Sequence, residues 1–245
     1  MTDIYCYIRS AAIWGIEPYL VEIEADISSG MPYFNMVGLL ASEVREARER
    51  VRSALHNSGE GFPTGRVTVN LSPADRRKEG TAFDLPIAVA LLCACNRLLP
   101  DAFEDTLIIG ELGLDGEIKA VKGVLPIVAM AEKKGIRKCI LPYENRQEAS
   151  MGGMLKIEAF HSLRELIADY MEEQGRTEEA GRDRSKNTAD KEREKNTADK
   201  EREKNTADKE REKDWTGKER NDGLIEVSEK NRAMENRHTA GEQGK

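Results

Sequence analysis

The sequence is poor in the residues that most often signal redox or metal chemistry. Of its 245 residues, 5% are aromatic, four are cysteine and three are histidine. Cys93 and Cys95 are separated by one residue instead of the two used by zinc and thiol–disulfide motifs, so we expect both to face a core. His56, His161 and His238 form no His-x-x-x-His or Glu-x-x-His pair, which predicts that the chain holds no metal.

Long apolar runs and an excess of positive charge are also missing. No stretch approaches the roughly 18 apolar residues that a membrane-spanning helix needs. Residues 1–15 lack the basic start and apolar run of a signal peptide. We therefore expect a cytoplasmic protein that does not contact a membrane. The formal net charge of −7 excludes a uniformly basic nucleic-acid binder, so any anion-binding surface must be a local patch.

A phosphate-binding loop of the form Gly-x-x-x-x-Gly-Lys-Ser/Thr is absent from the sequence. The glycine-rich stretch GELGLDG at 110–116 does not replace it, because Asp115-Gly116 is typical of a β-hairpin turn. The sequence thus predicts no nucleoside triphosphate site, no cofactor and no small-molecule substrate within these residues.

Strand and helix patterns are intermixed along residues 1–173, which predicts a single α/β domain. Residues 19–28 alternate apolar and acidic side chains, as in a strand with one buried face. The segment 82–95 is apolar nearly all round and predicts a central buried helix, with Thr81 and Asp84 at capping-box spacing. Further strands are expected at 33–39, 65–72, 138–142 and 156–160, a hairpin at 106–121, and helices at 42–56, 126–135 and 162–173.

The composition changes beyond Gln174. The unit KNTADKERE occurs three times, at 186–194, 195–203 and 204–212. Each copy balances Lys, Lys and Arg against Asp, Glu and Glu, and its only apolar residue is alanine, so it cannot bury enough surface to offset the entropy of ordering. We predict that residues 174–245 form a disordered low-complexity tail. It is either a charged spacer or an expanded repeat without a function.

Three ordered blocks carry a resemblance to a known family. They read HNSGEGFPTGRVTVNLSPADRRKEGTAFDLPIAVALL at 56–92, GELGLDGEIKAVKGVLPIV at 110–128 and LPYENRQEA at 141–149. Residues 1–170 resemble the N-terminal domain of the ComM/YifB family, magnesium-chelatase-like AAA+ proteins linked to DNA branch migration during natural transformation. The resemblance implies a Lon-protease-like fold of the α/β (α+β) class, with a mixed sheet and packed helices.

The residues that make Lon-like domains peptidases are replaced in this chain. The family's Gly-Pro-Ser-Ala-Gly stretch falls on residues 80–84, where Ala82 takes the place of the nucleophilic serine. The lysine that completes the dyad falls on Leu125. The resemblance therefore implies a domain without catalytic residues. A cryptic peptidase would have to use Thr81, whose side chain points about 100° away from that of its neighbour on a helical turn.

The basic run before the central helix is the remaining candidate site. Arg76, Arg77 and Lys78, with Arg66 at the start of the preceding strand, could bind DNA phosphates through counterion release. Two alternatives stay open: contacts between subunits of a ring, or a solvated loop in which Asp75 and Glu79 partner the cations.

Members of the ComM/YifB family continue into an AAA+ module, and only that module is expected to bind ATP and Mg²⁺. The 245 residues contain no such module, so we expect a chain truncated before the ATPase. The resemblance implies DNA as a partner and a hexameric ring for the full-length family protein. We interpret the chain as a non-catalytic accessory domain of a DNA-remodelling protein. The alternative is a stand-alone protein-binding or assembly module.

Overall fold

The computed structural model describes residues 4–176 and residue 200, with the side chains of residues 4 and 5 left out. The predicted tail, residues 174–245, therefore lies outside the described residues except at 174–176 and 200. Residues 174–176 belong to a helix over 163–176, so helical structure continues past the predicted domain boundary at residue 173.

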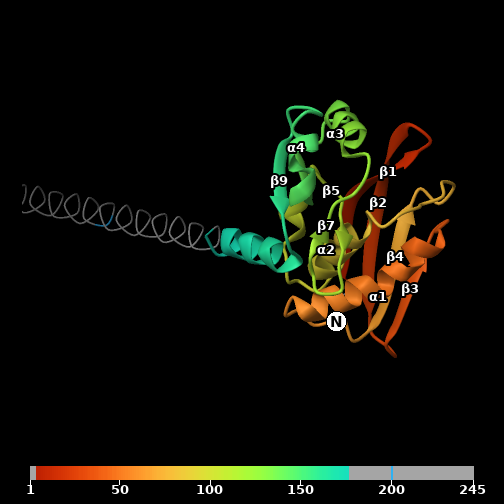
Figure 1. Ribbon diagram of the computed structural model, residues 1–245. Helices are drawn as coiled ribbons and strands as arrows, with labels where there is room; N and C mark the ends of the chain where they lie inside the picture. Colours follow the sequence, from red (N-terminus) through yellow and green to blue (C-terminus); the bar gives the residue numbers. More distant parts are fainter. Residues whose placement is uncertain (1–3, 177–199, 201–245) are drawn as a thin grey trace, which may run out of the picture. The chain divides into compact units, whose positions relative to one another are not determined.

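A seven-stranded mixed sheet forms the centre of the domain, with the strand order β3-β4-β2-β1-β5-β8-β9 (Figure 1). β1 pairs with β2 and β2 with β4 in antiparallel fashion, whereas the other neighbours are parallel. This mixed α/β architecture confirms the predicted fold class. The strands are β1 (Ile4–Trp14), β2 (Glu17–Ser28), β3 (Tyr33–Val37), β4 (Arg66–Ser72), β5 (Thr106–Ile108), β8 (Lys138–Pro142) and β9 (Lys156–Phe160).

The burial of β2 follows its alternating sequence. Val21, Ile23 and Ala25 are buried on one face, while Glu22 on the other face is exposed. A strand whose successive side chains point to opposite faces divides apolar from acidic residues in this way. The expected strand with one buried face is confirmed.

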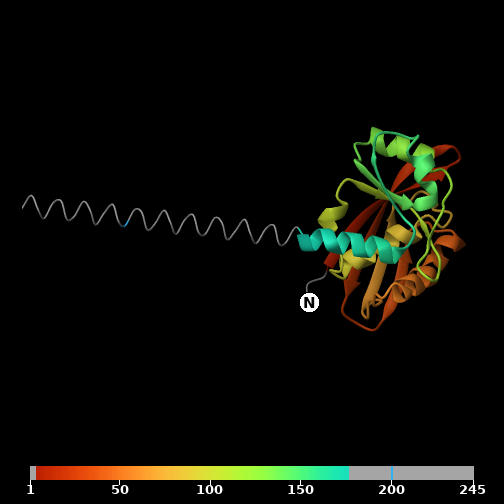
Figure 2. The ribbon, with the colours of Figure 1, turned by 60° about the vertical axis from the view of Figure 1, so that its left-hand side comes forward.

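Helices cover both faces of the sheet (Figures 1 and 2). α1 (Ser42–Asn57), α2 (Asp84–Ala94) and the helix over 163–176 contribute to a core with β2 and β4, whereas α3 (Val124–Lys133) packs in a second core against β1, β5 and β8. The short elements are α4 (Arg146–Ala149) and two 3₁₀ turns, η1 (Pro100–Phe103) and η2 (Tyr143–Asn145).

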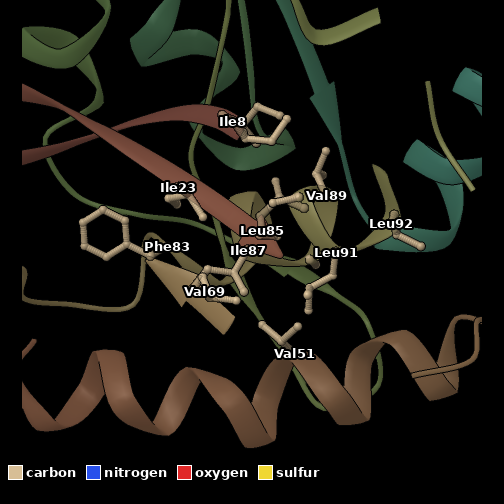
Figure 3. Packing of buried hydrophobic residues seen from close by; sticks show 14 of the residues in the cluster. Ile8, Ile23, Val51, Val69, Phe83, Leu85, Ile87, Val89, Leu91 and Leu92 are labelled. Atoms are coloured by element: carbon tan, nitrogen blue, oxygen red, sulfur yellow. The ribbon is translucent and has the colours of Figure 1, made fainter. Parts of the chain in front are cut away.

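The α2 helix is the central element that its all-round apolar sequence predicts. Every residue from Asp84 to Ala94 is buried. Figure 3 shows its side chains between the strands, represented by Ile23 and Val69, and the α1 residue Val51. The first residues of α2 are therefore packed on all sides by the core.

The hairpin prediction for residues 106–121 is right about the turn and wrong about the first strand. The pair is β6 (Glu111–Leu112) with β7 (Ile118–Lys119), and Gly116 adopts a φ of +90° in the turn, a conformation that favours glycine. Residues 106–108 instead form β5 of the large sheet. Leu107 and Ile108 are buried in opposite cores there, so they pack better between β1 and β8 than in an isolated hairpin.

Candidate functional site

The loop between β4 and α2 carries the basic run, and Lys78 anchors it. The Lys78 backbone N–H donates to Leu39 O at 2.9 Å, and its carbonyl accepts from Ala41 N at 3.0 Å. Its ammonium donates to Arg76 O at 2.8 Å and to Pro73 O. The residue is 0% exposed, and burial lowers the pKa of its side chain. Lys78 therefore holds the loop together from inside, and its ammonium faces carbonyls instead of solvent.

The two arginines of this loop lie on its surface. The Arg76 guanidinium lies 5.0 Å from the ring centre of Tyr19, and Arg77 Nε lies 2.9 Å from a carboxylate oxygen of Glu79. Tyr19 also donates its hydroxyl to Arg77 O at 3.1 Å. A cation stacked on an aromatic ring keeps its in-plane N–H groups available. Arg76 is thus the cation of this loop best disposed toward an anion.

The fourth predicted site residue, Arg66, is not brought together with the loop. It begins β4, whereas the loop follows the last residue of the same strand. A strand of seven residues is about 23 Å long. The Arg66 guanidinium instead lies 6.0 Å from the ring centre of Tyr33 at the edge strand β3.

A cleft of about 540 Å³ opens beside the same loop. Gly80, Thr81 and Ala82 line one wall together with Glu111 of β6. The end of β1 and the segment before α3 line the rest, through Ala11, Ala12, Ile13, Ala120, Val121, Lys122 and Gly123. Its volume lies within the range of about 300–1,000 Å³ that ligand-binding clefts occupy.

The cleft contains Ala82, which the resemblance aligns with the serine of Lon-like peptidases. Ala82 lies two residues before α2, and Leu125, which the resemblance aligns with the lysine, is 40% exposed and outside the lining residues. The hydroxyl of Thr81 donates to the Glu111 carboxylate. A methyl group offers neither a nucleophile nor a proton acceptor, so the arrangement at Ala82 supplies no acyl-transfer chemistry.

An ion pair between Arg50 and Asp84 ties the N-terminus of α2 to α1. The guanidinium of Arg50, on α1, donates from Nε to Asp84 Oδ2 at 2.6 Å and from a terminal nitrogen to Oδ1 at 2.9 Å. Asp84 Oδ2 also accepts the Leu112 N–H at 3.3 Å. Burial raises the pKa of Asp84, whereas Arg50 acts in the opposite direction. This geometry overturns the capping-box prediction: no side chain caps α2, because the Asp84 carboxylate is engaged by Arg50 and β6.

The histidines and cysteines are placed as follows. His56 and His161 are exposed, and His238 lies outside the described residues. Cys93 is buried, as are Cys6 and Cys139, and Cys95 is half-buried, so the expectation that Cys93 and Cys95 face the core holds fully for the first and partly for the second. Over residues 4–176 and 200, no three His, Cys, Asp or Glu side chains gather where they could hold a metal ion.

No helix among these described residues combines the length and apolar character needed to cross a bilayer. The exposed large apolar side chains gather in part at the tip of the β1–β2 hairpin, where Trp14 is 59% and Ile16 91% exposed.

The comparisons with known proteins identify the class. The family described as "Subunit ChlI of Mg-chelatase" matches residues 23–145. The chain is 42% identical to the competence protein ComM of Haemophilus influenzae over 144 residues, which are 59% of this chain and 28% of ComM. It is 39% identical to the YifB protein of Escherichia coli over 165 residues, 67% of this chain and 31% of YifB. A more distant match is Lon protease 2 of Bacillus subtilis, 25% identical over 143 residues, 52% of this chain and 26% of that protein.

The chain belongs to the Mg-chelatase ChlI-like family, and within it to the ComM/YifB proteins. Its matched part spans under a third of the length of these curated relatives.

Sequence reasoning missed three contributors to the cleft region: Arg50, Glu111 and the end of β1. The sequence of α1 contains many charged residues, and Arg50 is distinguished from them only by its position next to the apolar face of the helix. Glu111 lies in the glycine-rich stretch 110–116, whose sequence indicates only a hairpin, and residues 11–13 carry no motif. They reach the cleft only because the sheet places the end of β1 next to the α2 loop.

Proposed function

We propose that this chain is a non-catalytic accessory domain of a ComM/YifB-type DNA-remodelling protein, and that its work is DNA engagement or ring assembly. The observation that carries the proposal is Ala82, which occupies the nucleophile position in a cleft of about 540 Å³. The full-length protein would be an ATP-driven hexameric ring, with ATP and Mg²⁺ bound outside residues 1–245.

The residues in that cleft support the proposed lack of peptidase activity. Thr81 is the nearest hydroxyl, and it is engaged with Glu111. A lysine base at position 125 is missing, and Leu125 lies outside the lining. We expect no cleavage of casein or of fluorogenic peptides, and a Thr81→Ala variant that is indistinguishable from the parent chain. Cleavage that disappears in Thr81→Ala would contradict the non-catalytic role.

The arginines of the loop are the proposed contact to DNA phosphates or to a neighbouring subunit. Arg76 and Arg77 are exposed, and Arg66 forms a second, separate point of contact at β3. Lys78 supports the loop from inside, so we assign it a positioning role within the contact site.

DNA binding by the purified chain tests this function. Arg76→Glu with Arg77→Glu should weaken binding of a 30-base-pair duplex about tenfold at about 50 mM salt and much less at about 200 mM, because phosphate contacts act through counterion release. Arg137→Glu is the control, since Arg137 is an exposed arginine that lies outside this loop, directly before β8, where it pairs with Asp105. An unchanged affinity at both salt concentrations removes the DNA role and leaves ring assembly, which gel filtration measures separately.

The alternative function, a protein-binding or assembly module, is favoured by one observation: the exposed Trp14 and Ile16 at the hairpin tip. Exposed large apolar side chains that cluster are typical of protein-interaction surfaces. A monomer that ignores DNA would support this alternative.

A further inference from the structure

The strand β1 has an unpaired edge. β2 pairs with it along its whole length, from Ile4↔Ile27 to Trp14↔Glu17. On its other side the register with β5 is a single pair, Arg9↔Leu107, and β5 ends at Ile108. The chain then turns to α2, where the Gly110 N–H donates to Ala82 O at 3.0 Å. Residues 11–14 of β1 therefore run beyond their last strand neighbour on that side.

The cleft lies along this edge instead of on a face of the sheet. Ala11 belongs to the core under α3, and Ala12 packs against the core that contains α2. Successive side chains of a strand point to opposite faces, yet both residues line the cleft. A space bordered by both faces of a strand must be open to the strand's backbone edge.

The facing wall is fixed independently of β1. The Val121 N–H donates to Asn145 Oδ1 at 2.9 Å, and Asn145 Nδ2 donates back to Val121 O at 3.0 Å. The Ile13 side chain packs against Gly123 of this wall. The walls are thus preformed, which reduces the entropy that a ligand must offset on binding.

We infer that this cleft binds an extended peptide segment, which adds to the free edge of β1 as a further strand. Unpaired strand edges recognise extended chains through backbone hydrogen bonds, and flanking pockets select the side chains. The partner is a protein with an exposed extended segment, and the segment is bound without being cleaved because Ala82 supplies no nucleophile.

The lining defines the side chains of that segment. Ile13, Val121 and Ile127 suit small or branched apolar residues. The charged lining residues are Glu79, Glu111 and Lys122. Glu79 is paired with Arg77, whereas among the described residues neither Lys122 nor Arg50 forms an ion pair with Glu111. A lysine or arginine of the peptide would therefore face Glu111, at the wall where Thr81 donates to the same carboxylate.

The exposed Trp14 and Ile16 continue the apolar surface from the end of β1 to the hairpin tip. A bound segment longer than the cleft would continue onto these side chains. This continuity favours a peptide over a small molecule, which would fill the cleft and leave the tip uncovered.

The test uses the whole 245-residue chain and a fluorescein-labelled nonapeptide, Gly-Ser-Val-Ala-Lys-Val-Ala-Ser-Gly. One companion peptide has Glu in place of the central Lys, and a second carries N-methyl groups on alternate amides. We expect saturable binding of the parent peptide and at least about tenfold weaker binding of the N-methylated one, because each methyl group removes a backbone donor and crowds the edge that would pair. Glu111→Gln should weaken the lysine peptide about threefold and strengthen the glutamate peptide by a similar factor, because it removes an attraction in one case and a repulsion in the other.

Two variants and one spectrum locate the binding. Ala120→Trp should abolish binding by filling the cleft, whereas Ala74→Trp, on an exposed residue outside the lining, should not change it. Amide NMR shifts should concentrate at residues 11–13 and 120–123.

The other possible results would each contradict one part of the proposal. Equal binding of the N-methylated peptide overturns strand addition, and no binding by either unmethylated peptide, or shifts confined to other residues, overturns the peptide site. Loss of monomer on gel filtration that Ala120→Trp prevents would assign the cleft to a second copy of the chain instead. Cleavage of the bound peptide, read by mass spectrometry, would leave the site intact and contradict the non-catalytic role proposed above.

Discussion

Arg50 of α1 and Asp84 of α2 form a two-hydrogen-bond ion pair, with heavy-atom distances of 2.6 and 2.9 Å, at the buried start of the central helix. The Asp84 side chain is 0% exposed, whereas that of Arg50 is 20% exposed. The pair joins two helices that share one core and, through Leu112 N, the short β6 strand that carries Glu111 of the cleft.

This asymmetry predicts unequal effects of removing the two partners. Arg50→Met should cost about 3–5 kcal/mol in the free energy of unfolding, because it leaves a buried carboxylate without its cation. Asp84→Asn should cost less, about 1–3 kcal/mol, because Arg50 can turn toward water and Asn can still accept the Leu112 N–H. Urea unfolding of both variants measures the difference.

The double variant Arg50→Met with Asp84→Asn should be more stable than Arg50→Met alone, since it removes the orphan charge. The pair Arg77–Glu79, whose side chains are 56% and 60% exposed, provides the control: Arg77→Met should cost about 1 kcal/mol or less. Equal losses in Arg50→Met and Arg77→Met would show that the buried pair stabilises the fold no more than an exposed one.

The pH dependence of Arg50→Met follows from the pKa of Asp84. Burial raises this pKa above its unfolded value, and removing Arg50 takes away the group that opposes the rise. A carboxyl whose folded pKa is raised binds more protons when folded, so stability is present at low pH and is lost as pH rises through the folded pKa. The stability deficit of Arg50→Met should therefore be largest near pH 8 and shrink toward pH 4. A deficit that grows on acidification would reverse the assigned sign.

The Lys78 amine should react slowly with acylating reagents in the folded chain. Its ammonium donates to two carbonyls within the loop and the residue has no exposed surface. Acetylation with a water-soluble amine reagent, followed by peptide mass spectrometry, should modify exposed Lys119 and Lys122 at least about tenfold faster than Lys78. Comparable rates in buffer, without denaturant, would mean that the loop opens readily and that the Lys78 side chain is available to phosphates.

The contact of Ile13 with Gly123 predicts a clash that the Ile13 side chain can relieve by rotating. Gly123 adopts a φ of +78°, and a Cβ built there would overlap Cδ1, the end of the exposed Ile13 side chain. Gly123→Ala should therefore cost the about 1–2 kcal/mol expected for a left-handed alanine, with little added by the clash.

Gly135 gives a matched control for that prediction. It has a nearly identical φ of +79° but open space around its Cβ position, so Gly135→Ala should show the backbone cost alone. Urea unfolding should therefore give similar losses for Gly123→Ala and Gly135→Ala. A much larger loss in Gly123→Ala would show that the Ile13 side chain cannot move aside.

How far the sequence predicts the fold depends on whether the signal is local. The alternation in β2, the 3.6-residue spacing in α1 and the all-apolar α2 each have one explanation, and each element forms where expected. The hairpin failed in its first strand because Leu107 and Ile108 are buried by β1 and β8, which are far away in the sequence. The capping-box prediction failed for the same reason, since Arg50 lies 34 residues from Asp84.

The candidate site was less predictable than the fold. The basic run could be identified in the sequence. Its residue types alone do not predict that the Lys78 side chain is buried while Arg76 stacks on Tyr19. The cleft has no motif because its walls come from four separate segments that only the sheet order brings together. Only the family resemblance indicates that Ala82 stands where Lon-like peptidases have a serine. From the sequence pattern alone, Ala82 would be interpreted as an ordinary residue at the start of a helix.

The buried α2 helix also sets how this domain tolerates change. α1 has a solvent-exposed face, so its tolerance of substitutions should vary along the helix with a period of about 3.6 residues. α2 has no exposed face over its 11 residues, so this periodicity should be absent and only substitutions of similar volume should be tolerated. In a complete library of single variants, α2 would appear as a continuous block of positions that tolerate little change, directly after the exposed loop that carries Arg76 and Arg77, and its first residue, Asp84, would be the one charged position within it.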